Sequence, residues 1–142
     1  MSGKRGCICI FNDSEIERRK TAMYVKWITL QVNDMEASKN FYGQFLGLKE
    51  QREFSPAPGK TICFLGDDRG MQIELICDDQ AKGEAHPSAA NIGVCTDHYD
   101  DMYQKSKECG ILLSEPMVMG GNLHCFFVSD PDGTKLQIIQ NE

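Results

Sequence analysis

The chain has 142 residues, a formal net charge of −6 and 41% hydrophobic residues. This length can bury one sizeable core but is too short for two independent ones. The acidic balance argues against a nucleic-acid or anionic-membrane partner, and no apolar run approaches membrane-spanning length.

Residues 1–22 precede the first regular pattern, and we treat them as an N-terminal extension without assigned chemistry. Cys7 and Cys9 are not followed by a second pair at metal-ligand spacing, so a metal site there is not favoured. The odd total of seven cysteines, several of them at strand positions, favours reduced thiols and a cytoplasmic location.

Two halves of the chain follow, and each predicts a strand, a helix and then a meander of strands. In the first half, residues 27–32 alternate as a strand, Asp34 opens a helical pattern, and Gly47 ends it. In the second half, residues 91–96 alternate, Asp97 opens the helical pattern, and Gly110 ends it. The two units span about residues 23–83 and 88–142, and together they form one domain over residues 23–142.

The two halves are copies of each other. Phe64, Asp67 and Gly70 recur as Phe127, Asp130 and Gly133 at one fixed offset (130 − 67 = 63), inside strand–turn–strand segments. The helix signals recur at the same offset (97 − 34 = 63), whereas the first strands match at 64 (91 − 27 = 64). We therefore expect the second unit to have a turn one residue shorter before its helix.

Side chains alternate across a strand, so each strand has one apolar face and one mixed face. Ile28, Leu30 and Val32 predict the face that packs on the helix. The opposite face mixes an aromatic ring, amides, a carboxylate and small residues, which suits the lining of a ligand cup better than a core. Its members are Trp27, Thr29, Gln31, Gln72, Glu74, Ile76, Asn91, Gly93, Cys95, Lys135, Gln137 and Ile139.

Over about residues 25–140 the chain resembles the vicinal oxygen chelate superfamily, which includes glyoxalases, bleomycin-resistance proteins, extradiol dioxygenases and fosfomycin-resistance enzymes. The resemblance rests on the strand ending at Asp34, on residues 41–48 and 73–75, and above all on residues 127–133. It implies an α+β fold of paired βαβββ units, the glyoxalase/bleomycin-resistance fold, forming a curved sheet around a cup. It also implies a homodimer.

The resemblance implies a metal site at four positions, which fall here on Trp27, Glu74, Asn91 and Gln137. Only Glu74 is a competent ligand, because indole has no lone pair to donate and neutral amide oxygens bind metals weakly. From this donor set we expect no metal and no other cofactor.

The mixed face also supplies the candidate functional residues. Trp27 offers a flat surface for an aromatic or planar ligand, or else fills the space that the metal left or packs at a dimer interface. Glu74 beside it is a candidate catalytic acid/base, or else hydrogen-bonds to Gln137 or Asn91. Cys95 is a candidate nucleophile or a small buried hydrophobe. The predicted ligand-binding set is Trp27, Thr29, Gln31, Gln72, Glu74, Asn91, Cys95, His124 and Gln137.

Three functional hypotheses follow. The first is a metal-free small-molecule binding protein of the bleomycin-resistance type, which holds an amphipathic or aromatic ligand in the cup. The alternative is a superfamily enzyme, lyase/isomerase or dioxygenase-like, that uses Glu74 as acid/base or an atypical metal site such as Glu74 with His124. The third is an interaction module whose cup is closed by Trp27 and Phe64.

Overall fold

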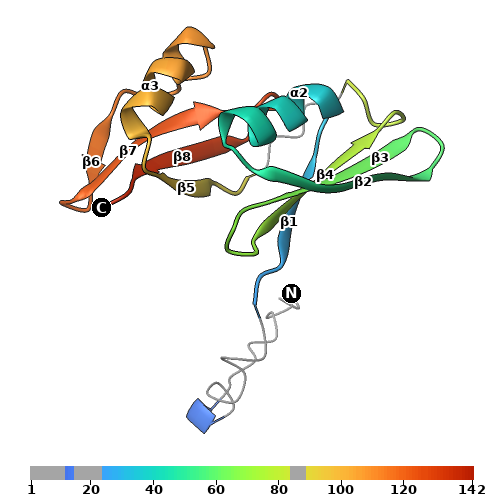
Figure 1. Ribbon diagram of the computed structural model, residues 1–142, viewed down its shortest axis with the longest axis horizontal. Coiled ribbons are helices and arrows are strands. Elements are labelled where there is room, and N and C mark those ends of the chain that lie inside the picture. The colour runs from blue at the N-terminus through green and yellow to red at the C-terminus, as the bar shows by residue number, and fades with distance from the viewer. Residues whose placement is uncertain (1–11, 15–23, 84–88) are drawn as a thin grey trace, which may run out of the picture.

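The computed structural model describes residues 12–14, 24–83 and 89–142, so most of the N-terminal extension and His86 lie outside the described residues. It contains two four-stranded mixed sheets, ordered β1-β4-β3-β2 and β5-β8-β7-β6. Figure 1 shows the sheets side by side, with the helices α2 and α3 on the same side of them. The predicted fold of paired βαβββ units is confirmed.

The elements follow the same order in both units. In the first unit they are β1 (Trp27–Gln31), α2 (Met35–Lys39), the π-helix η1 (Asn40–Phe45), β2 (Lys49–Ala57), β3 (Lys60–Gly66) and β4 (Gln72–Asp78). In the second unit they are β5 (Ile92–Thr96), α3 (Tyr99–Glu108), β6 (Met117–Met119), β7 (Leu123–Ser129) and β8 (Lys135–Gln140). In each sheet the first and last strands of the unit pair in parallel, and the other pairs are antiparallel.

The repeated Asp/Gly segments form the same turn twice. Asp67 and Asp130 each accept two backbone N–H groups on Oδ1, from Arg69 and Met71 in one turn and from Asp132 and Thr134 in the other. Gly70 and Gly133 have φ of 93° and 92°, a conformation that a side chain disfavours. The recurring sequence therefore specifies a recurring turn through local hydrogen bonds.

Between its first strand and the glycine after its helix, the first unit has one residue more than the second. This residue lies inside the helical segment, so the predicted shorter turn before the second helix is wrong. Strand pairing matches Thr29 with Gly93, and Met35 begins its helix 64 positions before Tyr99 begins the other. The offset falls to 63 only at Gly47 and Gly110. In between, η1 takes up one residue as a π-turn, in which the Leu46 N–H donates to the Phe41 carbonyl at 3.0 Å.

Asp97 consequently does not cap the second helix. The N-cap of α3 is His98, which makes no side-chain cap hydrogen bond, whereas Asp34 accepts the Ala37 N–H at the start of α2. Asp97 instead accepts from the Asn141 amide at 2.7 Å.

One core joins both units on the helix side of the sheets. Its buried members include Leu30, Val32, Phe41, Tyr42, Phe126, Val128, Leu136 and Ile138. Polar bonds cross the same boundary: the Tyr42 hydroxyl donates to Asp130 Oδ2 at 2.7 Å, and the Asn33 N–H donates to Asp132 Oδ1 at 3.0 Å. The helix of the first unit is thereby tied to the repeated turn of the second.

None of the helices within the described ranges is long and apolar enough to cross a membrane.

Candidate functional site

The cup face of the first sheet carries a carboxylate held by a threonine. Parallel pairing of β1 with β4 places Thr29 beside Glu74, and the Thr29 hydroxyl donates to Glu74 Oε1 at 2.6 Å. Glu74 is half-buried. Within the described residues Thr29 is the only hydrogen-bond partner found for this carboxylate, and neither Asn91 nor Gln137 bonds to it. One carboxylate oxygen is therefore oriented while the other remains available.

The matched position of the second sheet has different chemistry. Gln137 lies beside Gly93, and its Nε2 donates to Cys125 Sγ at 3.2 Å and approaches Met119 Sδ at 3.7 Å. Asn91, just before β5, is exposed. The two sheets thus present a carboxylate–hydroxyl pair on one side and an amide–sulfur cluster on the other.

A pocket of about 300 Å³ opens on the cup face of the first sheet, lined by Lys26, Trp27, Gln51, Arg52, Phe64 and Gln72. The Trp27 ring meets the buried Phe64 ring edge-on, with centroids 5.4 Å apart. Both rings line this pocket, which lies beside their contact.

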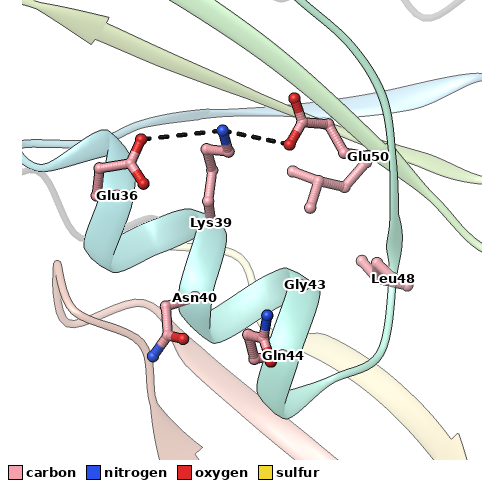
Figure 2. A pocket seen from close by; sticks show the side chains of 8 residues that line it. Glu36, Lys39, Asn40, Gly43, Gln44, Leu48 and Glu50 are labelled. Carbon is pink, nitrogen blue, oxygen red and sulfur yellow. Dashed lines mark ion pairs between the residues drawn. The ribbon is translucent and has the colours of Figure 1, made fainter.

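A second pocket, of about 330 Å³, lies on the helix side under α2 and η1, lined by Glu36, Lys39, Asn40, Gly43, Gln44, Leu48, Glu50 and Leu65 (Figure 2). Lys39 Nζ lies 3.1 Å from Glu53 and 3.2 Å from Glu50. Burial alone would lower the pKa of Lys39, but these carboxylates outweigh it and raise the pKa well above its usual value. Because the ammonium is already paired, this pocket offers no free cation to a ligand, and we take the cup-side pocket as the candidate site.

The predicted site residues do not all share one location. Trp27, Thr29, Gln31, Gln72 and Glu74 lie on the cup face of β1 and β4, and Cys95 lies with Gly93 on the corresponding face of β5. The alternation of β7 places His124 with Phe126, whose ring packs 5.1 Å from that of Tyr99 in α3. His124 therefore lies on the helix side and does not join Glu74.

The two cations of the pocket, Lys26 and Arg52, were not predicted from the sequence. Arg52 lies on the cup face because a β-bulge at Gln51 shifts the pairing of β2 with β3, so that Arg52 is opposite Phe64. Strict alternation from Glu50 would put Arg52 on the helix side, and no residue type marks the bulge. Lys26, just before β1, gave no signal beyond its charge.

The chain belongs to the Glyoxalase/Bleomycin resistance protein/Dioxygenase superfamily, whose model matches residues 24–138. It is 36% identical to a probable lactoylglutathione lyase of Vibrio cholerae over 80% of this chain and 87% of that protein. It is 31% identical to a lactoylglutathione lyase of Haemophilus influenzae over 84% of this chain and 94% of that protein.

Solved structures show the same fold. Glyoxalase I of Leishmania major superposes with a TM-score of 0.68 at 22% identity, covering 83% of this chain and 86% of that one. Glyoxalase I of Zea mays gives a TM-score of 0.71 at 22% identity, covering 82% of this chain and 44% of that one.

These relatives correct the first functional hypothesis. We expected a metal-free binding protein from the lost ligand positions, but the curated relatives are named as lyases, and the findings support the alternative of an enzyme. The error came from equating the absence of the metal ligands with the absence of catalysis, although the chain has a carboxylate, Glu74, held by Thr29.

The metal that the family resemblance implies does not fit the residues of this chain. Trp27 offers no lone pair, Asn91 and Gln137 offer neutral amides, and the Gln137 amide nitrogen is directed at sulfur. Across the described ranges no three His, Cys, Asp or Glu side chains are grouped so as to hold a metal ion. We therefore derive no step through a metal.

Proposed function

We propose that this protein is a lyase/isomerase-type enzyme that moves a proton on a small carbonyl compound held in the cup, with Glu74 as the acid/base. The observation that carries the proposal is the Thr29–Glu74 pair, in which one carboxylate oxygen is fixed at 2.6 Å and the other remains available. A positioned carboxylate of this kind contributes about 10²–10⁴-fold to proton transfer.

The relatives' names suggest the reaction to test. Lactoylglutathione is an isomer of the hemithioacetal that methylglyoxal forms with glutathione. A base that removes the proton from the carbon bearing sulfur and returns a proton to the neighbouring carbon, while the hydroxyl proton moves from the first oxygen to the second, converts the hemithioacetal into the thioester. No atom is gained or lost and no oxidant is needed. Glu74 could perform both transfers from one position.

The experiment is a turnover assay with methylglyoxal and glutathione, following thioester formation by its ultraviolet absorbance. We expect the wild type to be active and Glu74→Gln to lose about 10²–10⁴-fold in kcat. The matched control is Glu108→Gln, at an exposed position at the end of α3. Activity that survives Glu74→Gln would contradict the proposed role, and an inactive wild type would contradict the proposed reaction.

We further propose that two copies of this chain assemble as a dimer. The outer strands are β1 and β2 in one sheet and β5 and β6 in the other, each with one edge unpaired within the described residues, and such edges are commonly covered. Sedimentation should show a species of about twice the 16.0 kDa chain mass. A 16.0 kDa species at all concentrations would contradict the dimer.

We also propose a cytoplasmic location. The cysteines within the described residues, namely Cys63, Cys77, Cys95, Cys109 and Cys125, are all free thiols, as a reducing compartment favours. Cell fractionation of the protein with a C-terminal tag tests this.

A further inference from the structure

The cup-side pocket contains two cations and no anion, on a chain whose net charge is −6. Lys26 and Arg52 are its charged members, and the other four lining residues are neutral. In the part of the chain that the structure describes, neither cation forms an ion pair with a carboxylate. Two unpaired cations at one pocket favour an anionic ligand.

Aromatic rings hold Arg52 in place. Its guanidinium lies 4.7 Å from the Phe64 ring centroid and 5.0 Å from that of Phe54, and the β-bulge at Gln51 directs it to this face. Contact with two aromatic rings restricts the guanidinium, and no carboxylate of the described residues pairs with it, so less entropy is lost when an anion binds. A carboxylate is the anion that matches this fork geometry.

Trp27 supplies a planar apolar surface beside these cations. Trp27 as a whole residue is 42% exposed, its ring meets Phe64 edge-to-face, and Lys26 Nζ lies 5.6 Å from the ring centroid. An aromatic residue exposed to this degree at the pocket suits a flat, conjugated group better than a branched aliphatic one. The pocket has the volume of about ten water molecules, enough for one or two rings.

We propose that the pocket binds a planar aromatic or conjugated carboxylate, with the carboxylate on Arg52 and Lys26 and the ring on Trp27. The substrate assignment rests on the proposed function: Glu74 lies two residues from Gln72 on the same face, about 7 Å along β4, within reach of a carbon of the bound molecule. Among carbonyl substrates of the proposed enzyme, the pocket therefore favours those that also carry an aromatic or conjugated carboxylate.

The test uses 2-naphthoate as an unreactive probe. Because Trp27 is the only tryptophan, its single indole N–H signal in a nitrogen-15 NMR spectrum reports binding directly. We expect 2-naphthoate to shift this signal and to bind at least about tenfold more tightly than neutral 2-naphthamide, as expected for hydrogen bonds to a charged group. The affinity should fall as salt is raised.

Variants separate the contribution of the Arg52 charge from that of the Trp27 ring. Arg52→Gln should weaken 2-naphthoate about tenfold, whereas Arg69→Gln, at an exposed arginine of the Asp67 turn, should have no effect. Trp27→Leu, followed by the line width of the probe, should weaken 2-naphthoate but leave cyclohexanecarboxylate unchanged. Equal binding of acid and amide, indifference to Arg52→Gln, or no binding to folded protein would each overturn the proposal. If a second copy of the chain occupied the pocket, the folded protein would not bind the probe.

Failure of this proposal and failure of the proposed function are distinguishable. If the wild type converts the hemithioacetal in a Glu74-dependent way but does not bind 2-naphthoate, the ligand class is wrong and the catalytic role stands. If 2-naphthoate binds in an Arg52-dependent way but no turnover depends on Glu74, the pocket stands and the function is wrong.

Discussion

Asp67 and Asp130 hold the same place in the two copies of one turn, but their surroundings differ. Both fix the turn through two backbone N–H groups on Oδ1. Asp67 is exposed, whereas Asp130 is only 5% exposed and accepts the Tyr42 hydroxyl from the other unit on Oδ2. Burial raises the pKa of Asp130 even though its hydrogen bonds oppose the rise. The motif therefore specifies a turn in both units. In the second unit, contact with Tyr42 also makes this turn a link between the units.

The largest expected effect separates these two aspartates directly. Asp130→Ala should cost about 3 kcal/mol of unfolding free energy, because it leaves two backbone N–H groups and a buried hydroxyl without partners. Asp67→Ala should cost about 1 kcal/mol, since water can replace its side chain. Urea denaturation of both variants measures the difference, and equal costs would show that the packing of Asp130 adds nothing.

Three substitutions would give both cup faces the metal-binding side chains that the family resemblance implies at these positions. Trp27→His, Asn91→His and Gln137→Glu, combined with the existing Glu74, should raise zinc affinity at least about 100-fold, or about 2.7 kcal/mol. Calorimetric titration measures the gain against the wild type. A triple variant no better than the wild type would show that the four positions do not converge, and wild type purified with near-stoichiometric metal would contradict the donor argument.

Removal of the Tyr42 hydroxyl, which donates the hydrogen bond to Asp130, should lower the unfolding free energy less than Asp130→Ala does. Tyr42→Phe should cost about 2 kcal/mol, the range of a hydrogen bond to a charged group. Tyr103→Phe is the matched control, because its hydroxyl donates to exposed Glu115, and should cost little.

The cost of Tyr42→Phe should also depend on pH. Because the pKa of Asp130 is raised in the folded protein, its stabilising contribution is full below the unfolded value of 3.8 and is lost as pH rises through the folded value. The Tyr42 hydrogen bond lowers the pKa of Asp130, so its removal should raise that pKa further. Urea denaturation should therefore show a larger cost at neutral pH than near pH 4, and a cost independent of pH would contradict this assignment.

The smallest expected effect is at Gly93, which stands where the first unit has Thr29. A Cβ at Gly93 would meet only Ile139 Cδ1, at 3.5 Å, which is ordinary contact. Gly93→Ala should therefore change stability by about 0.5 kcal/mol or less. A melting temperature lowered by more than about 5 °C would show that the second cup face needs this open space.

Local signals predicted the units, the turns and the cup faces of β1 and β4. Asp/Gly turns and strand alternation depend on neighbouring residues, so a single sequence carries them. The bulge at Gln51 and the π-turn of η1 each insert one residue without a distinctive residue type, and the positions of Arg52 and Asp97 were missed for that reason. The burial of Asp130 depends on Tyr42, 88 positions away, which no local pattern reveals.

An inserted residue would rotate the remainder of a regular helix by about 100° and carry its apolar stripe off the sheet. In η1 the insertion stays local: Phe41 and Tyr42 remain buried, and β2, β3 and β4 occupy the same places in their unit as β6, β7 and β8. An alignment of the two copies therefore needs its gap between Met35 and Gly47. A gap placed before the helix would equate Asp34 with Asp97, the first a helix cap and the second a partner of Asn141.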